Sequence, residues 1–180
     1  MLEFHEVSVI DAPAERCFDL ARSVEVHLLD NSHCGEPTAA ISGQTTGLVE
    51  MGQHVTWQAR HLGVRQKLTT RVTAFHRPVF FQDTMCAGAF RSMQHDHFFR
   101  PLIGDRTEMT DILRICAPVP VLGRIAELLV LRRYMHGLLC DRCRVTKRVA
   151  ESPAAWKQYL SHSEPAPAVD SADAHRHSRR

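Results

Sequence analysis

The apolar positions at the start of the chain form a short β-branched run over residues 4–10, which predicts a strand. Proline suits the first position of a helix because its φ is fixed near the helical value and it leaves no N–H unpaired, so Pro13 predicts that a helix follows. Four apolar side chains then recur at helical spacing and form one face of this helix: Ala14, Cys17, Phe18 and Ala21. A second short helix is predicted to begin at Val24.

From His54 onward the apolar positions change to a period of two, the pattern of strands with one buried face. Gly63 separates two such strands into a hairpin, and Pro78 ends the second. Further strands follow at residues 80–86, 91–102 and 106–117. Five consecutive strands joined by short turns predict one antiparallel sheet. Residues 33–52 are rich in Gly, Ser, Thr and Pro, which predicts a loop with one weak edge strand at most.

A helix of about thirty residues is predicted from Val121 onward, because apolar residues recur there and only Gly137 interrupts its interior. Its apolar surface must be buried, and the face of the sheet is the available partner. Beyond Pro153 the composition changes to Ser, Ala, Pro, His and Arg, which is typical of a mobile tail. The sequence thus predicts an α+β domain over residues 1–151, a curved antiparallel sheet around a long C-terminal helix, and a mobile or disordered tail over 152–180.

Composition and charge narrow the functional classes. The chain has 180 residues, of which 44% are hydrophobic and 23% charged, and this suits one globular domain. A net charge of +2 is too small for the basic surface of a dedicated nucleic-acid-binding protein. No apolar run approaches the ~20 residues of a membrane-spanning helix, and the N-terminus lacks a signal-peptide pattern. Because the six cysteines lack the dense spacing of a secreted scaffold, we expect a cytoplasmic protein with reduced thiols.

The order of these elements over residues 3–150 resembles the START and polyketide-cyclase superfamily, also called the SRPBCC or helix-grip fold. The first strand and the helix that begins at Pro13 are similar to the start of that family. Other segments look like a bacterial subgroup of ligand-binding members: 52–57, 95–98, 107–111 and 118–123. The resemblance implies an internal cavity for a small apolar or amphipathic molecule, such as a lipid, an isoprenoid, an aromatic or a polyketide-like compound. Because the superfamily includes carriers, receptors and cyclases, the chemistry stays open.

Strand parity predicts which side chains face this cavity, since alternate residues of a strand share a face. In the last strand Met109, Asp111 and Leu113 belong to the more apolar set, which we expect to face the long helix. The connecting turns allow registers in which the odd-numbered residues of 81–85 and 93–99 face the same way. The result is a polar patch inside an apolar pocket: Asp83, His95, His97 and Asp111. The predicted apolar wall consists of Val55, Trp57, Phe81, Met85, Met93, Phe99, Met109, Leu113, Leu128 and Leu131.

Three interpretations of the polar patch stay open. A buried carboxylate can hold an imidazole in one tautomer and raise its pKa, as an acid–base site requires. The same groups could orient a ligand carbonyl or hydroxyl, or they could form a structural network or face solvent. Two histidines and a carboxylate also suit zinc or iron, but the sequence supplies no independent third ligand, so we expect no metal. A glycine-rich nucleotide motif is also lacking, so no cofactor is expected.

Other residues that could suggest a function are a pair near the pocket, a cysteine pair and the basic residues of the long helix. Arg60 and His61 are candidates for the mouth or wall of the pocket. The Cys140-x-x-Cys143 pair falls inside the long helix without a second pair, so two thiols on neighbouring turns are expected rather than a redox or zinc motif. A solvated face accounts for the basic residues of the long helix, which are Arg124, Arg132, Arg133, Arg142, Arg144, Lys147 and Arg148.

Three functions compete. The first is a binding or carrier module whose partner is a small hydrophobic molecule. The second is a cofactor-independent cyclase or dehydratase in which His95 or His97 acts as general acid or base, oriented by Asp83 or Asp111. The third is an interaction protein that uses a sheet edge or the basic end of the helix. In a weaker variant, that basic segment touches an anionic membrane surface during ligand delivery.

Overall fold

A computed structural model describes residues 1–29, 37–61, 63–116 and 125–160, with the backbone alone for 125–129. The strands in this part of the chain are β1 Leu2–Ile10, β2 Ala39–Gly43, β3 His54–His61, β4 Val64–His76, β5 Phe80–Ala87, β6 Ser92–Leu102 and β7 Arg106–Cys116. The helices are α1 Ala14–Ala21, α2 Val24–Leu28, α3 Ile125–Glu151 and α4 Ala155–Leu160.

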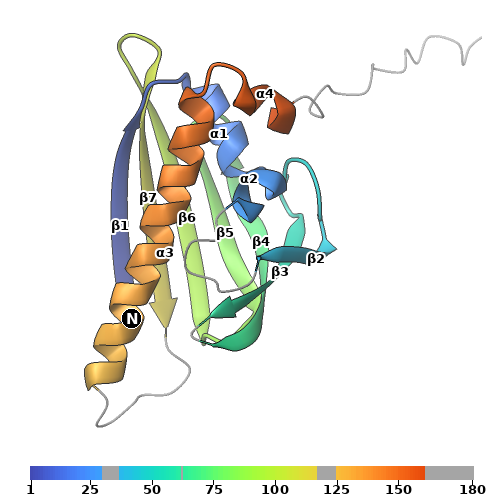
Figure 1. Ribbon diagram of the computed structural model, residues 1–180, viewed down its shortest axis with the longest axis vertical. Coiled ribbons are helices and arrows are strands. Elements are labelled where there is room, and N and C mark those ends of the chain that lie inside the picture. Colours follow the sequence, from blue (N-terminus) through green and yellow to red (C-terminus); the bar gives the residue numbers. More distant parts are fainter. Residues whose placement is uncertain (30–36, 62, 117–124, 161–180) are drawn as a thin grey trace, which may run out of the picture.

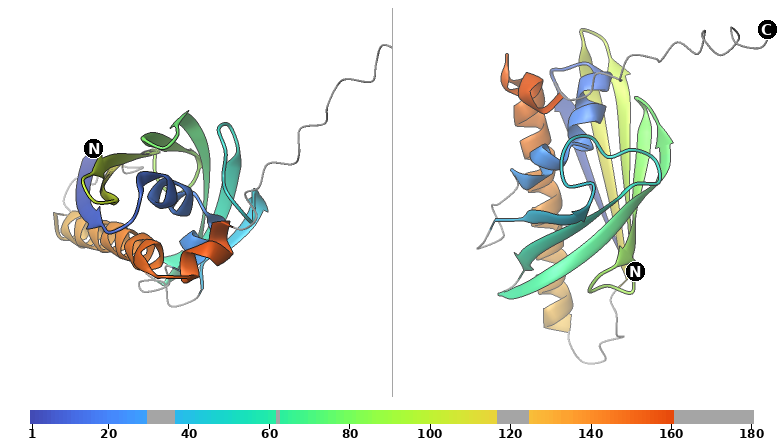
Figure 2. Two further views of the ribbon diagram at one scale, coloured as in Figure 1. Left: turned by 90° about the horizontal axis from the view of Figure 1, so that it is seen from above. Right: turned by 90° about the vertical axis from the view of Figure 1, so that its right-hand side faces the viewer.

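The strands form one antiparallel sheet in the order β1-β7-β6-β5-β4-β3-β2. The first strand therefore pairs with the last, and β2 is the weak edge strand that the loop composition allowed. Figure 2 shows, from above, that the sheet curves around the interior and that α3 lies across its open side. The predicted α+β fold, a curved sheet gripping a long C-terminal helix with two short helices after the first strand, is confirmed (Figure 1).

The register places the predicted inward residues opposite one another. His97 pairs with Asp111 and His95 with Leu113 between β6 and β7. Across the other edge of β6, Asp83 of β5 pairs with His95. Residues of β7 alternate between buried and partly exposed along the strand, with Asp111 in the buried set. The parity argument from the sequence therefore holds on these strands, because no bulge interrupts the β6–β7 ladder.

Helix α1 fills one end of the curved sheet. Its Phe18 is fully buried and makes edge-to-face contacts with Phe75, Phe81 and Phe99, at ring-centroid distances of 5.2, 5.3 and 5.4 Å. Such edge contacts satisfy the aromatic quadrupoles as well as filling space. The interior beneath α1 is therefore packed, and the remaining hollow lies along the middle of α3, between Leu131 and Arg142.

The end of the domain differs from the expected tail. Residues Ala155–Leu160 form α4, and Trp156, Tyr159 and Leu160 pack against the core cluster around α1. The guanidinium of Arg16 lies 4.3 Å from the centre of the Trp156 ring. Part of the segment predicted as a mobile tail from residue 152 thus forms α4, whose apolar residues at i, i+3 and i+4 form one packed face. Residues 161–180 and 121–124, which carry the rest of the tail and the predicted helix start, lie outside the described residues.

No helix in the described part of the chain combines the length and the apolar character needed to cross a membrane.

Candidate functional site

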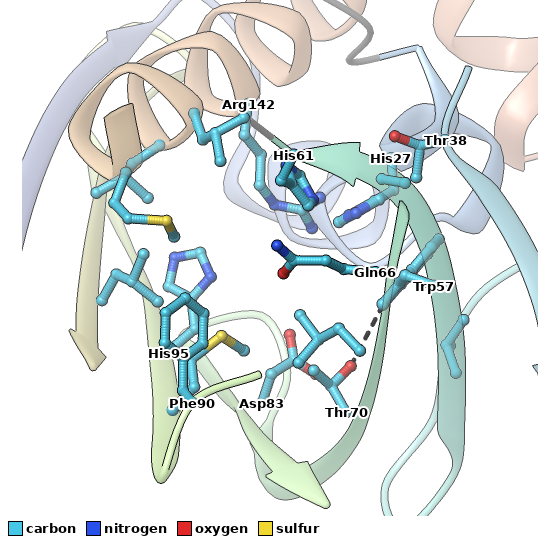
Figure 3. A pocket seen from close by; sticks show the side chains of 18 of the residues that line it. His27, Thr38, Trp57, His61, Gln66, Thr70, Asp83, Phe90, His95 and Arg142 are labelled. Carbon is cyan, nitrogen blue, oxygen red and sulfur yellow. Dashed lines mark hydrogen bonds between the residues drawn. The ribbon is translucent and has the colours of Figure 1, made fainter. Parts of the chain in front are cut away.

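A cavity of about 290 Å³ lies between the inner face of the sheet and α3 (Figure 3). This volume is close to the lower limit of small-molecule sites, which are roughly 300–1,000 Å³. Six residues of the predicted wall line it: Val55, Trp57, Phe81, Met93, Leu113 and Leu131. The exposed residues Lys67 and Ala89 also line it, which indicates that the cavity reaches the surface between the start of β4 and the β5–β6 turn.

The remaining predicted wall residues are placed differently. Phe99 and Met109 belong to the buried cluster that includes α1, so they face inward as predicted but do not line the hollow. The ring of Phe99 contacts that of Phe18. Met85 is partly buried in a second cluster that includes Leu113, and it does not line the cavity either. These three residues do not border the hollow, because strand parity specifies a face of the sheet and not the element that covers it. The side chain of Leu128 lies outside the described residues.

The polar patch forms one buried cluster centred on Asp111. Its Oδ1 atom lies 3.1 Å from Nε2 of His95 and 2.5 Å from Nδ1 of His97. The other ring nitrogen of His97, Nε2, lies 3.4 Å from Oδ2 of Asp83. The two imidazole rings are 3.9 Å apart between centroids, and His97 stacks on Phe81 at 4.1 Å. The structure thus brings together all four residues that parity selected.

The charges of this cluster follow from burial and mutual attraction. Burial opposes a charge on His97, but the carboxylates of Asp111 and Asp83 outweigh it and raise the pKa of His97 to about 9. Burial likewise opposes ionisation of Asp111, yet the two imidazoles hold the pKa of its carboxyl below the usual value. Burial and the neighbouring His97 lower the pKa of His95. At neutral pH these shifts favour an ionised Asp111, a protonated His97 and a neutral His95.

Only part of this cluster reaches the cavity. His95 and Asp83 line it, whereas His97 and Asp111 lie behind them and are 1% and 2% exposed. Neither the His95 nor the His97 Nε2 atom has a hydrogen-bond partner of good geometry among the described residues, even though carboxylate oxygens lie nearby. The arrangement therefore presents the neutral ring of His95 to a bound molecule, held in place by an ionised carboxylate. Such a ring can hydrogen-bond a ligand carbonyl or hydroxyl or accept a proton.

Arg142 is a cavity residue that the sequence interpretation missed. It was assigned to a solvated basic face, but its side chain is half-buried, lines the cavity and donates from Nη2 to the Ala21 carbonyl at 2.9 Å. Burial lowers the pKa of its guanidinium to about 10. Helical spacing is the signal that could have found it, because Leu131, Met135, Leu138 and Arg142 follow one stripe of α3 at intervals of four, three and four residues.

Two further histidines line the cavity. His61, a predicted mouth or wall residue, has its Nδ1 atom 2.8 Å from the Tyr134 hydroxyl. Arg60, predicted with it, is exposed and donates to the Gly63 carbonyl instead. His27 of α2 was not predicted; its ring stacks on Trp57 at 3.8 Å, and its buried Nδ1 has no hydrogen-bond partner among the described residues. No local pattern in the sequence links α2 to β3, so only the fold shows this contact.

Two clusters in the described part of the chain have ligand atoms close enough to hold a metal ion. They are His95 with His97 and Asp111, and Glu6 with His136 and Cys140. In the first cluster a metal would have to displace the proton that the carboxylates hold on His97. The thiols of Cys140 and Cys143 point to different carboxylates, at 3.4 Å from Glu6 and 3.3 Å from Asp111, so they do not form a joint site.

Known structures share this architecture. TTHA0849 from Thermus thermophilus matches with a TM-score of 0.65 and 17% sequence identity, over 91% of this chain and 100% of that one. A START superfamily protein from Mycobacterium smegmatis matches with a TM-score of 0.62 and 13% identity, over 83% and 97%. The Zhui aromatase/cyclase from a Streptomyces species matches with a TM-score of 0.57 and 14% identity, over 82% and 95%.

No model of a known family and no curated protein matches the chain. At the identities of the structural matches, the likeness shows the fold and leaves activity open. The predicted helix-grip fold, the fold of START proteins and of an aromatase/cyclase, is therefore confirmed.

Proposed function

We propose that the protein binds a small amphipathic molecule in the cavity between sheet and α3. The observation that carries this proposal is a hollow of about 290 Å³ whose wall is mostly apolar and into which a few polar groups converge. The apolar wall contributes affinity by removing ligand surface from water, at about 25 cal/mol per Å² before the costs of association. His95, backed by Asp111, orients the polar part of the ligand.

The fold supports this proposal as an analogy. The similar structures include a START superfamily protein and a ginseng major latex-like protein, which share the curved sheet and the long helix. The cavity of this chain lies between the sheet and α3, and it is independent support because it follows from this chain's own side chains.

Filling the cavity is the direct test. N-phenyl-1-naphthylamine is a neutral aromatic probe whose fluorescence rises in apolar surroundings, and we expect it to bind the wild-type protein saturably. Leu131→Trp places a larger side chain in the cavity, and overpacking of this kind should weaken probe binding about tenfold. Val130→Trp is the matched control, because the neighbouring Val130 is exposed and should tolerate the change. Absence of saturable binding, or equal loss in both variants, would refute the proposal.

A second function is carried by one observation, the place of the His95 imidazole at the cavity wall, where burial and the neighbouring His97 lower its pKa. We propose as the alternative a cofactor-independent dehydratase or cyclase of the same ligand class. His95 would accept the proton α to a ligand carbonyl and return it to the departing hydroxyl, so that water leaves and a conjugated ketone remains. Asp111 would hold the ring, and the charged His97 and Asp83 would complete the support behind it.

The dehydration can be followed with 4-hydroxy-4-phenylbutan-2-one, because its product, benzylideneacetone, absorbs in the near ultraviolet. If this alternative is correct, the wild-type protein accelerates the reaction and His95→Gln lowers the rate by about 100-fold or more. His76→Gln, which changes an exposed histidine at the end of β4, should keep the wild-type rate. Equal rates for wild type and His95→Gln would leave the binding function standing alone.

A further inference from the structure

We propose that the molecule bound in the cavity carries an anionic group, a carboxylate, sulfonate or phosphate, that pairs with Arg142. This inference rests on the proposed binding function and names the ligand class for it. It departs from the purely apolar ligand that the wall residues alone would favour.

The argument begins with the charge balance of the cavity. Arg22 lines it but is already paired, at 2.8 Å from Asp19 and 2.6 Å from Glu50. Asp83 lies 3.4 Å from His97. Arg142 differs, because its hydrogen-bond partner among the described residues is the Ala21 carbonyl. No carboxylate of these residues lies within ion-pair distance of its guanidinium.

One carbonyl hydrogen bond does not offset the free-energy cost of half-burying a charged guanidinium. Removing a cation from water costs free energy that a counter-charge or several hydrogen bonds must offset. Arg142 cannot become neutral instead, because a pKa of about 10 keeps it charged at physiological pH. Guanidinium presents several N–H donors in one plane, and these match the oxygens of a carboxylate or phosphate. The N–H donors of Arg142 that have no partner among the described residues therefore fit an anion better than a neutral ligand.

Neighbouring groups on the cavity wall also favour a negatively charged ligand. His27 lines the cavity with a buried Nδ1 atom that lacks a partner among the described residues, and this atom can donate a further hydrogen bond. Lys67 is exposed where the cavity reaches the surface, where it can attract an anion from solution. In the view of Figure 3, Arg142 and His27 lie above the hollow, whereas Asp83 lies below it. An amphipathic anion would thus be held by its charged end near α3, with its apolar body on the sheet and a second polar group, a carbonyl or hydroxyl, toward His95.

A matched pair of probes separates the charge from the apolar body. 1-Anilinonaphthalene-8-sulfonate and N-phenyl-1-naphthylamine share the ring system and differ by one sulfonate. We expect Arg142→Met to weaken binding of the sulfonate probe about 10- to 100-fold, the usual range for a hydrogen-bonded charge, and to leave the neutral probe within about twofold. Arg148→Met removes the same charge from the exposed face of α3 and should leave both probes unchanged.

A displacement experiment on the wild-type protein is independent of any variant's folding. Dodecanoate, dodecyl phosphate and dodecanol share one alkyl chain. Each competes with bound N-phenyl-1-naphthylamine, below the micelle concentrations of the two anions and below the solubility limit of dodecanol. We expect at least one of the two anions to displace the probe at a concentration about tenfold or more below that of dodecanol. The stronger of the two identifies a carboxylate or a phosphate as the preferred group.

The outcomes distinguish this inference from the binding function on which it rests. If both probes bind but Arg142→Met weakens them equally, or Arg148→Met weakens the sulfonate probe as much, pairing with Arg142 is refuted and ligand binding stands. If dodecanol and both anions displace the probe at equal concentrations, pairing with Arg142 is likewise refuted and ligand binding stands. If neither probe binds the wild-type protein, the proposed function fails and this inference fails with it.

Discussion

Asp111→Asn should lower the free energy of unfolding by about 3–5 kcal/mol at pH 7, the cost of breaking a buried ion pair by removing one partner. The carboxylate of Asp111 is 2% exposed and lies within 3.1 Å of both histidines. Without it, the charge on His97 keeps only Asp83, at 3.4 Å, as a counter-charge. The amide of asparagine preserves the shape of the side chain, so the measured loss reports charge and hydrogen bonding more than packing. Urea unfolding followed by tryptophan fluorescence gives the value.

An exposed ion pair between β7 and its neighbour β6 serves as the control. Glu108 of β7 pairs with Arg100 at 2.7 Å, and the Arg100 side chain is largely exposed. Because exposed ion pairs contribute about 0–1 kcal/mol, Glu108→Gln should change stability by less than about 1 kcal/mol. If Asp111→Asn also stays within that limit, the buried cluster does not stabilise the fold.

Stability should pass through a maximum near pH 6.5 and fall by about 3 kcal/mol as the pH rises to about 9. The usual pKa of a histidine is 6.5, and that of His97 is raised to about 9, which corresponds to this energy at about 1.4 kcal/mol per pH unit. The stabilisation is complete below pH 6.5, where His97 is protonated in both states, and it is lost as the folded protein releases that proton. His95 has the opposite sign, because its lowered pKa makes stability fall as the pH drops below 6.5.

Unfolding midpoints measured in urea between pH 5 and pH 9 test this dependence. His97→Gln should remove the alkaline decline, whereas His76→Gln, at an exposed position, should retain it. The carboxyl of Asp111 does not disturb this window, because its lowered pKa affects stability only below its usual value of 3.8. A flat profile from pH 6.5 to pH 9 in the wild-type protein would contradict the raised pKa of His97.

Both predictions concern residues that strand parity had selected. Side chains alternate strictly along a strand, so an assignment for Met109 and Leu113 extends to Asp111 and, across short turns, to His95 and His97. The turns on either side of β6 are short enough to limit the register to a few choices, and the observed pairing of His97 with Asp111 is one of them. For this reason the four residues of the polar cluster could be predicted from the sequence.

The sequence could not predict which inward-facing residues border the cavity and which are covered by another element. Phe99 and Met109 share the inward face with His95, yet α1 covers them, because Phe18 from a distant part of the chain occupies that end of the sheet. Likewise, Trp156, Tyr159 and Leu160 carry an apolar face in a segment whose composition resembles a tail, and the core cluster formed by α1 and α3 gives that face a partner.

The sequence by itself determined the order of elements, the antiparallel sheet and the face on which each strand residue lies, because these depend on local periodicity and short connections. Only the tertiary structure decided which inward side chains border the hollow and which are covered by α1. It also placed Arg142 of α3 and His27 of α2 at the wall of the hollow. Periodicity orients a side chain relative to its own element. What that side chain meets depends on the packing of elements distant in sequence, and this packing leaves Arg142 without a counter-charge among the described residues.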